Sequence, residues 1–223
     1  MSSRAGKYFT RHRGSEMFYE FDRPDPQLSP SPFKACVVPR PIGWISTVDA
    51  QGVLNLAPFS FFNAISEEPA MVMYCANGAH VDGGEKDSVK NVRETGEFVV
   101  NLAIWDLRHA VNESSATVAR SVDEFKLAGL TPAPSRMVRP PRVAESPICL
   151  ECVASDIYEL PIDEPGDIGR MVIGKVLGMH IADGAIVNGR VASAKLRPIA
   201  RLGYREYAVI DEIFKMTRPG SER

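Results

Sequence analysis

The chain has 223 residues, of which 44% are hydrophobic, and a formal net charge of −2 at pH 7. A chain of this length can bury a substantial core, either as one large domain or as a core domain with extensions. Its near-neutral charge excludes the strongly basic surface expected of a protein that binds nucleic acid or an anionic membrane. The sequence has no run of roughly 20 apolar residues, so no membrane-spanning helix is expected.

The N-terminal region predicts little regular structure. Residues 1–20 are basic and are followed by no apolar block, which excludes a secretory signal. A transit peptide would share this composition, but we favour a weakly ordered tail and expect a cytoplasmic protein. Residues 22–32 are rich in proline, which fixes φ and removes backbone donors, so an extended linker is predicted there.

Ordered structure is expected to begin near Phe33. We therefore divide the chain into an N-terminal extension at 1–32, a main domain at 33–212 and a tail at 213–223.

Residues 43–59 predict a β-hairpin, because strand-forming residues flank turn residues at 49–52. The next stretch, APFSFFNAIS at 57–66, is unusual. As one continuous strand it would place Phe59, Phe61 and Asn63 on one face. Neither face would then be wholly apolar, which indicates a surface that meets a ligand with a flat apolar part and a polar part.

Further strands are predicted at 70–76, 97–103, 148–160 and 170–182 from their β-branched and aromatic content. The segment 86–96 predicts a helix that Asp87 or Ser88 caps and Gly96 ends.

Two more helical segments are predicted, one at 106–118 and one at 121–130. The second begins with a capping box of Ser121 and Glu124. Residues 193–203 read as a short helix or an irregular basic segment. Because strands outnumber helices and short turns join several of them, the sequence predicts a mainly β fold, an antiparallel barrel with a few helices. No G-x-G-x-x-G follows a strand, which disfavours a Rossmann fold.

No catalytic side chain and no metal site are predicted. Cys149 and Cys152 form a C-x-x-C, but a spacing of three in a strand puts the two sulfurs on opposite faces. No second cysteine pair or histidine pair completes a zinc site. The two cysteines are therefore interpreted as small buried residues.

Three segments combine small donors or a cation with apolar or glycine-rich neighbours. Their polar residues are Ser46 and Thr47, then Ser60 and Asn63, then Lys86, Ser88 and Asn91. The third segment lies at a predicted helix start, where free backbone amides and the helix dipole favour an anion. A carboxylate would repel that anion, so Asp87 fits better as the helix cap. A purely structural role for these serines, in turns and caps, fits the sequence equally well.

Three longer stretches resemble a known family. They are VVPRPIGWISTVDAQGVLNLAPFSFFNAISEEPAMVMYC, KDSVKNVRETGEFVVNLA and LRPIARLGYREYAV. In this order they resemble the flavin reductase-like family, the FMN-binding split β-barrels that include flavoredoxin, and the similarity runs from about Phe33 to Ile210. Ser88 stands where threonine is usual, and Tyr204 stands where a second glycine often follows RLG. The second departure puts the shape of one pocket wall in doubt.

The resemblance implies that phenyl rings and strand backbone hold a flat isoalloxazine while Lys86 and Ser88 lie near the FMN phosphate. Arg201 and His180 are weaker candidates. Arg40 either serves the phosphate or bridges to solvent, and Trp44 either stacks on the ring or belongs to the core. The full set of candidate cofactor-binding residues is Arg40, Trp44, Ser46, Thr47, Ser60, Phe61, Phe62, Asn63, Lys86, Asp87, Ser88, Asn91, His180 and Arg201.

The resemblance further implies an oxidoreductase that passes a hydride from NADH or NADPH to flavin N5, with the reduced flavin going to an acceptor or an oxygenase partner. It also implies a homodimer. Three alternatives remain open. The chain could be a non-enzymatic FMN carrier, an oxidase related to pyridoxamine phosphate oxidases that uses Arg197, Arg201 and Arg205, or a cofactor-free interaction module.

Overall fold

The computed structural model describes residues 17–162 and 167–220. The weakly ordered start predicted for residues 1–20 therefore lies mostly outside the described residues. The linker predicted at 22–32 contains no helix or strand, apart from an isolated bridge that pairs Arg23 with Glu20, and the first helix is α1 (Phe33–Cys36). Among the described residues, no helix combines the length and apolar character needed to cross a membrane.

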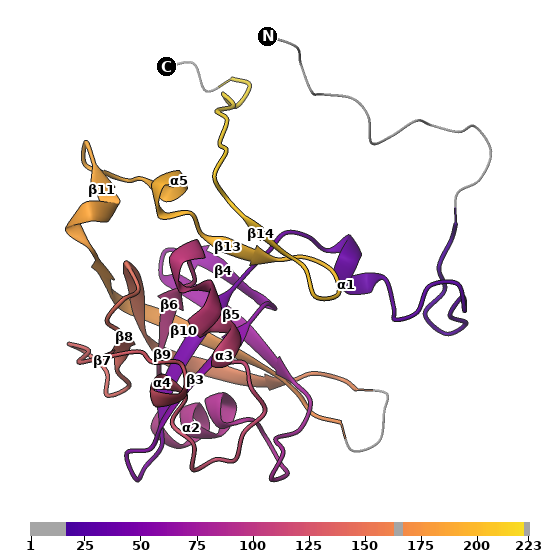
Figure 1. Cartoon of the computed structure of the whole chain (residues 1–223), viewed down its shortest axis with the longest axis horizontal. Coiled ribbons are helices and arrows are strands. Elements are labelled where there is room, and N and C mark those ends of the chain that lie inside the picture. The colour runs from indigo at the N-terminus through magenta and orange to yellow at the C-terminus, as the bar shows by residue number, and fades with distance from the viewer. Residues whose placement is uncertain (1–16, 163–166, 221–223) are drawn as a thin grey trace.

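A seven-stranded sheet forms the body of the protein (Figure 1). Its strands, in spatial order, are β3 (Leu54–Phe59), β2 (Gly43–Val48), β6 (Glu97–Leu102), β9 (Ile148–Glu159), β10 (Gly169–Ile181), β5 (Ala70–Asn77) and β4 (Phe62–Glu67). Every neighbouring pair is antiparallel, which confirms the predicted strand arrangement and excludes a doubly wound parallel sheet.

The predicted hairpin is confirmed by the pairing of β2 with β3, from Gly43 opposite Phe59 to Val48 opposite Leu54. Its turn follows from local chemistry, because the Asp49 carboxylate accepts hydrogen bonds from the backbone amides of Gln51 (2.9 Å) and Val53 (2.8 Å).

The stretch 57–66 is not one strand, so the expected alternation of its side chains is wrong. β3 ends at Phe59 and β4 begins at Phe62, with a bend at Ser60 and Phe61 between them. Because β3 and β4 are the two outermost strands of the sheet, this two-residue corner connects its opposite edges and forces the sheet to curl. We call Ser60 and Phe61 the corner.

Close packing accompanies this curl. A Cβ atom on Gly43 of β2 would lie 2.5 Å from Cδ2 of Phe62, so only glycine lets the start of β4 approach β2 so closely. The backbone amide of Cys75 donates to the carbonyl of Phe61 at 2.8 Å, which ties the corner to β5.

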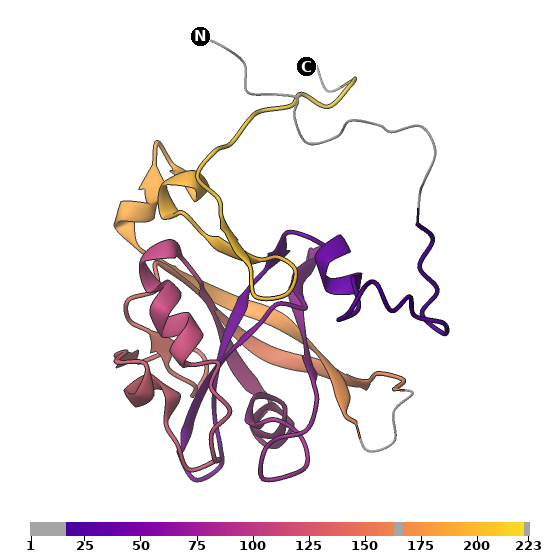
Figure 2. The same ribbon diagram turned by 45° about the vertical axis from the view of Figure 1, so that its right-hand side comes forward.

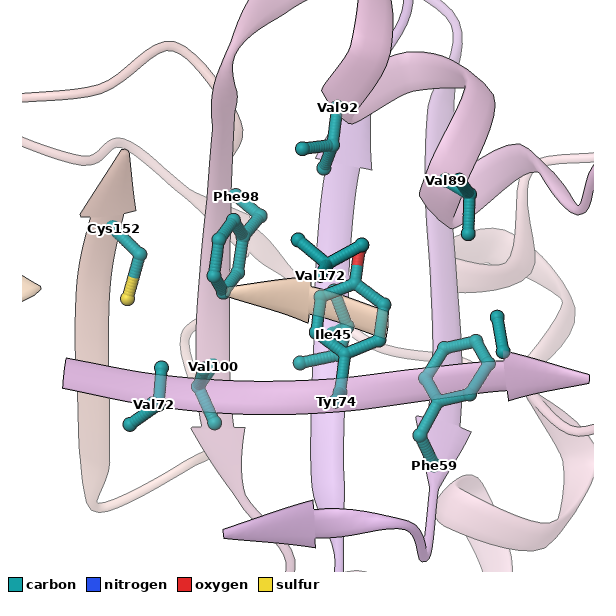
Figure 3. Close-up of a cluster of buried hydrophobic side chains, with 11 residues drawn as sticks. Ile45, Phe59, Val72, Tyr74, Val89, Val92, Phe98, Val100, Cys152 and Val172 are labelled. Carbon is teal, nitrogen blue, oxygen red and sulfur yellow. The ribbon is translucent and has the colours of Figure 1, made fainter. Parts of the chain in front are cut away.

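The main core fills the inside of the curled sheet (Figure 3). Tyr74 is fully buried between Phe59 (ring centroids 5.2 Å apart) and Phe98 (5.4 Å). Its hydroxyl donates to the carbonyl of Ser88 at 2.8 Å, which satisfies the buried phenol and fixes the helix that carries Ser88. A second cluster holds the fully buried Trp44 together with Phe125 and Val143.

The predicted helix at 86–96 is confirmed as α2 (Asp87–Thr95), with Gly96 left-handed at its C-cap (φ 73°). It packs across one end of the barrel (Figures 1 and 2). The predicted cap is wrong: Lys86 occupies the N-cap position and no side chain caps the helix.

Two helix predictions need correction. The segment 106–118 is helical only over η1 (Trp105–Leu107) and α3 (Arg108–Glu113). The helix predicted at 121–130 is α4 (Glu124–Leu127), and its cap is Asp123, whose carboxylate accepts from the amides of Phe125 and Lys126. Glu124 is therefore free of the capping box and is available for another role.

A small sheet crosses the end of the barrel opposite α2, next to α1 (Figure 1). It consists of β1 (Arg40–Pro41), β13 (Ile199–Arg201) and β14 (Tyr207–Val209), and it pairs Arg40 with Arg201. The basic segment 193–203 is thus α5 (Ser193–Leu196) followed by a strand. The remaining short elements are β7 (Pro132–Ala133), β8 (Arg142–Val143), η2 (Asp183–Ala185), β11 (Ile186–Val187) and β12 (Arg190–Val191).

Candidate functional site

Two cavities meet beside the corner. The larger has a volume of about 490 Å³ and is bordered by the corner, the small sheet and α1. The smaller has a volume of about 160 Å³ and lies at the start of α2. Pro58 and Ser115 line both, so the two volumes are neighbouring compartments of one candidate site. We call them the large cavity and the small cavity.

The large cavity has a flat apolar wall and a cationic wall. Ile42, Pro58 and Phe61 supply apolar surface, while Arg40 and Arg201 supply positive charge. Tyr204 and Tyr207 complete the side formed by the small sheet. Such a surface suits a planar ligand that is electron-rich or carries negative charge at its edge.

Arg40 holds the rim of the large cavity together. Its guanidinium donates to the carbonyls of Val37 (2.6 Å), Leu202 (2.8 Å) and Lys34, and it is only 5% exposed. Burial and the neighbouring charge of Arg201 lower the pKa of Arg40. Because so many of its donors bond backbone carbonyls, the side chain joins the α1 region to the small sheet as well as facing the cavity.

The small cavity contains an unsatisfied buried hydroxyl. Ser88 is 1% exposed and lines this cavity, and its Oγ has no hydrogen-bond partner. Lys86 lines the same cavity at the uncapped start of α2. An orphaned hydroxyl, an uncapped helix N-terminus and a lysine together form a site for an anion such as a phosphate group.

Asp87 also lines the small cavity, but its carboxylate is paired with neighbouring side chains. Its carboxylate is paired with Arg120, and Nε2 of His80 lies 3.2 Å from it. Since Nδ1 of His80 accepts from the amide of Asp82 at 3.0 Å, Nε2 is the nitrogen that can donate to Asp87. Arg120 also bonds the carbonyls of Gly83 and Glu85, each at 2.8 Å, and so fixes the loop before α2.

Glu124 lines the small cavity and was not predicted as a site residue. The residue is 6% exposed, and its Oε2 accepts a hydrogen bond from the amide of Leu56 at 3.1 Å. Burial raises the pKa of Glu124 to about 7. No sequence pattern indicates this role, because the residue fits a capping box and only the fold places it next to Leu56.

The predicted site residues fall into two groups. Seven line the cavities: Arg40, Ser60, Phe61 and Arg201 line the large one, and Lys86, Asp87 and Ser88 line the small one. The other seven do not line either cavity: Trp44, Ser46, Thr47, Phe62, Asn63, Asn91 and His180.

Several residues of the second group support the cavity walls through hydrogen bonds without lining the cavities. The indole of the fully buried Trp44 donates to Ser114 Oγ at 2.9 Å, and Ser114 lines the small cavity. Thr47 accepts from the side-chain amides of Asn55 and Asn91, each at 3.0 Å, which connects β2 with β3 and α2.

The remaining residues of the second group lie away from the two cavities. Ser46 donates to the carbonyl of Pro141 at 2.6 Å, Phe62 packs against the core, and Asn63 is exposed. His180 lies 2.5 Å from the buried carboxylate of Glu151. Cys149 and Cys152 belong to different core clusters, which confirms that they lie on opposite faces, and burial raises their thiol pKa values to about 11 and about 12.

Sequence reasoning missed Ser115 and Tyr207 as lining residues. Both lie in segments that the fold brings to the corner from far along the chain. The three arginines weighed for an oxidase are also separated, because Arg201 lines the large cavity whereas Arg197 lies over Trp105, with its guanidinium 5.3 Å from the ring centroid.

Comparison with known proteins gives a consistent result. Residues 35–198 match the model of the flavin reductase like domain. An uncharacterised protein of Halalkalibacterium halodurans is 38% identical over 185 residues, which cover 82% of this chain and 87% of that protein.

Two solved structures show the same fold. Component B of nitrilotriacetate monooxygenase from Bacillus cereus superposes with a TM-score of 0.82 at 30% identity, covering 91% of this chain and all of that one. A Shewanella frigidimarina protein assigned as a flavin reductase with a split barrel domain superposes with a TM-score of 0.77 at 18% identity, again covering 91% and 100%. The predicted split-barrel fold is therefore confirmed, although the strand pairing leaves β3 and β4 as separate edges.

Glu124 predicts a specific pH dependence of stability. Its pKa rises from 4.5 to about 7 on folding, so its contribution to stability is complete below about pH 4.5 and is lost as the pH rises through 7. Glu124→Gln should remove this loss, worth ~3 kcal/mol between pH 4.5 and pH 8. Urea unfolding of both proteins across this range measures the difference.

The matched control for this experiment is Glu113→Gln, which changes an exposed carboxylate. Its free energy of unfolding should follow the wild-type pH profile. Parallel profiles for Glu124→Gln and the wild type would show that folding does not raise the pKa of Glu124.

Proposed function

Because the chain belongs to the flavin reductase-like family, we propose that it is an FMN-binding flavin reductase, an oxidoreductase that transfers a hydride from NADH or NADPH to flavin N5. The observation that supports this most strongly is the orphaned Ser88 hydroxyl, which lies in an anion site next to a larger cavity with a flat apolar wall. FMN has a planar, largely apolar ring system joined to a dianionic phosphate, and the two cavities match these two parts.

The residues present fit FMN. In this proposal, Lys86, the Ser88 hydroxyl and the first amides of α2 hold the phosphate in the small cavity. The ring system lies in the large cavity against Phe61 and Pro58, with Ser60 as a hydrogen-bonding group at the corner. The pairing of Asp87 with Arg120 and His80 lowers the electrostatic cost of placing a dianion next to that carboxylate.

Bound FMN would supply the hydride-accepting chemistry, so the protein needs no acid or base of its own. The roles of the side chains are to bind, orient and shield. Arg40 and Arg201 keep positive charge on the wall of the large cavity, which favours an electron-rich ring.

We further propose that the reduced flavin passes to an oxygenase partner or another acceptor. The similarity to component B of nitrilotriacetate monooxygenase supports this, since that protein's name makes it one component of an oxygenase system. A homodimer is supported by large apolar side chains exposed on the two terminal segments, among them Phe18 (86% exposed) and Phe214 (82%). The cytoplasm is the expected compartment.

The proposal predicts rapid flavin reduction under anaerobic conditions. Purified protein is mixed with FMN and then with NADH or NADPH, and the visible absorbance of oxidised flavin is followed. Loss of absorbance well above the protein-free rate is expected with at least one nucleotide. Bound flavin that stays oxidised with both nucleotides would contradict the reductase and favour a carrier or an oxidase.

The anion site predicts a second outcome. Lys86→Ala combined with Ser88→Ala should weaken FMN binding roughly 100-fold, because it removes a cation and a hydroxyl from the phosphate. Flavin fluorescence quenching measures the affinity. The double variant should keep its fold, since Ser88 Oγ makes no hydrogen bond within the described structure.

Lys90→Ala is the matched control. It removes a lysine from the same helix, one that pairs with Glu94 at 2.7 Å instead of lining the small cavity. Its FMN affinity should equal that of the wild type. Unchanged FMN affinity in the Lys86 and Ser88 double variant would refute the phosphate assignment.

A further inference from the structure

A third cavity, of about 310 Å³, shares Tyr207 with the large cavity. Trp105, Arg108, Asn112 and Arg205 line it together with Ile199 and Ala208. We call it the Trp105 cavity. Its volume lies at the lower end of the range found for small-molecule sites. Tyr207 lines both cavities, so one elongated ligand could occupy the two together.

Three arginines gather around Trp105 without an acidic partner. The guanidinium of Arg108 lies 4.1 Å from the Trp105 ring centroid and that of Arg197 lies 5.3 Å from it. Arg205 lines the same cavity. In the part of the chain that the structure describes, none of the three forms an ion pair, and no carboxylate lines the cavity. Like charges brought together repel one another, so this cluster favours an anionic ligand.

The backbone holds this cluster in place at some cost. Arg197 has a φ of 50°, in the left-handed region that a residue with a Cβ rarely adopts. Its carbonyl accepts from the amide of Trp105 at 2.9 Å, and Ile104 forms a β-bridge with Pro198. These contacts fix the segment that carries Arg197 beside the indole. This left-handed residue is the C-cap of α5, and it turns the chain so that the Arg197 guanidinium lies over the indole.

We propose that the Trp105 cavity binds the adenosine 2′-phosphate end of NADPH. This rests on the proposed function, since it assumes that the nicotinamide end reaches flavin in the large cavity. Arginine forks bind phosphate oxygens with paired hydrogen bonds, and purines stack on guanidinium planes such as the one that Arg108 places over Trp105. The same preference is known from the Rossmann fold, where a carboxylate binds the ribose 2′-hydroxyl of NADH and an arginine accommodates the 2′-phosphate of NADPH. The Trp105 cavity has only the second kind of residue, so NADPH is the favoured donor.

A binding experiment with adenosine fragments tests the proposal without any flavin chemistry. Adenosine 2′,5′-bisphosphate and 5′-AMP are titrated separately into the full-length protein and followed by calorimetry. We expect the bisphosphate to bind at least tenfold more tightly than 5′-AMP, because only the bisphosphate carries a 2′-phosphate. Absence of bisphosphate binding, or equal affinity for the two fragments, would overturn the assignment.

The variant Arg205→Ala tests whether the fragments bind in the Trp105 cavity. Arg205 is exposed, so its removal should leave the thermal unfolding midpoint unchanged. Affinity for the bisphosphate should fall about tenfold, and the KM for NADPH should rise by a similar factor with kcat unchanged. Arg190→Ala, which removes an exposed arginine from β12, is the control and should bind as the wild type does.

The two failures can be told apart. Fragment binding that depends on Arg205, in a protein that does not reduce flavin, would sustain the Trp105 cavity as a nucleotide site and overturn the reductase. If the protein reduces flavin and Arg205→Ala binds the bisphosphate as tightly as the wild type does, the reductase would be sustained. The Trp105 cavity would then be overturned as the nucleotide site. FMN affinity should be the same in all three proteins, because Arg205 and Arg190 line neither of the two FMN compartments.

Discussion

The corner at Ser60 and Phe61 is the constraint on which the candidate site depends. Two residues connect the opposite edges of a seven-stranded sheet, so the sheet curls until β3 and β4 approach each other. Gly43 permits the approach, because any side chain there would strike Phe62. Pro58, Ser60 and Phe61 then line the large cavity, and Pro58 also lines the small cavity that begins at α2. The flat apolar wall and the anion site are therefore adjacent because of how the barrel closes.

Two charged side chains beside the cavities have partners within the protein. The buried Arg40 satisfies much of its guanidinium with backbone carbonyls, and Asp87 is paired with Arg120 and His80. Ser88 Oγ is different, because it is buried in a cavity wall and has no partner. A phosphate bound in the small cavity would therefore supply the hydrogen bond that Ser88 Oγ lacks. Glu124 adds a carboxyl group to the same cavity, with a pKa of about 7 that keeps part of it neutral near physiological pH.

The sequence was informative where local chemistry decides the structure. The hairpin at β2 and β3, the helix α2 with its end at Gly96, and the long strands β9 and β10 follow from turn residues, helix signals and β-branched runs. It was less informative where tertiary contacts override local preference. Ser121 and Glu124 match a capping box, yet Asp123 caps α4 and Glu124 accepts from the amide of Leu56 in the neighbouring strand β3. Trp44, Thr47 and Asn91 were predicted as candidate cofactor-binding residues, but the packed structure shows them supporting the cavity walls from behind. Ser115 and Tyr207 reach the site from distant segments, which no local pattern records.

The central claim is that the small cavity at the start of α2 holds the phosphate of a flavin whose ring lies at the corner. The most direct test compares the affinities of the wild-type protein for FMN and for riboflavin, which has the same ring system and ribityl chain without the phosphate. Because a helix N-terminus, Lys86 and the Ser88 hydroxyl would all contact that group, FMN should bind roughly 100-fold more tightly. Equal affinities for the two flavins would contradict the account, because the phosphate would then contribute nothing to binding.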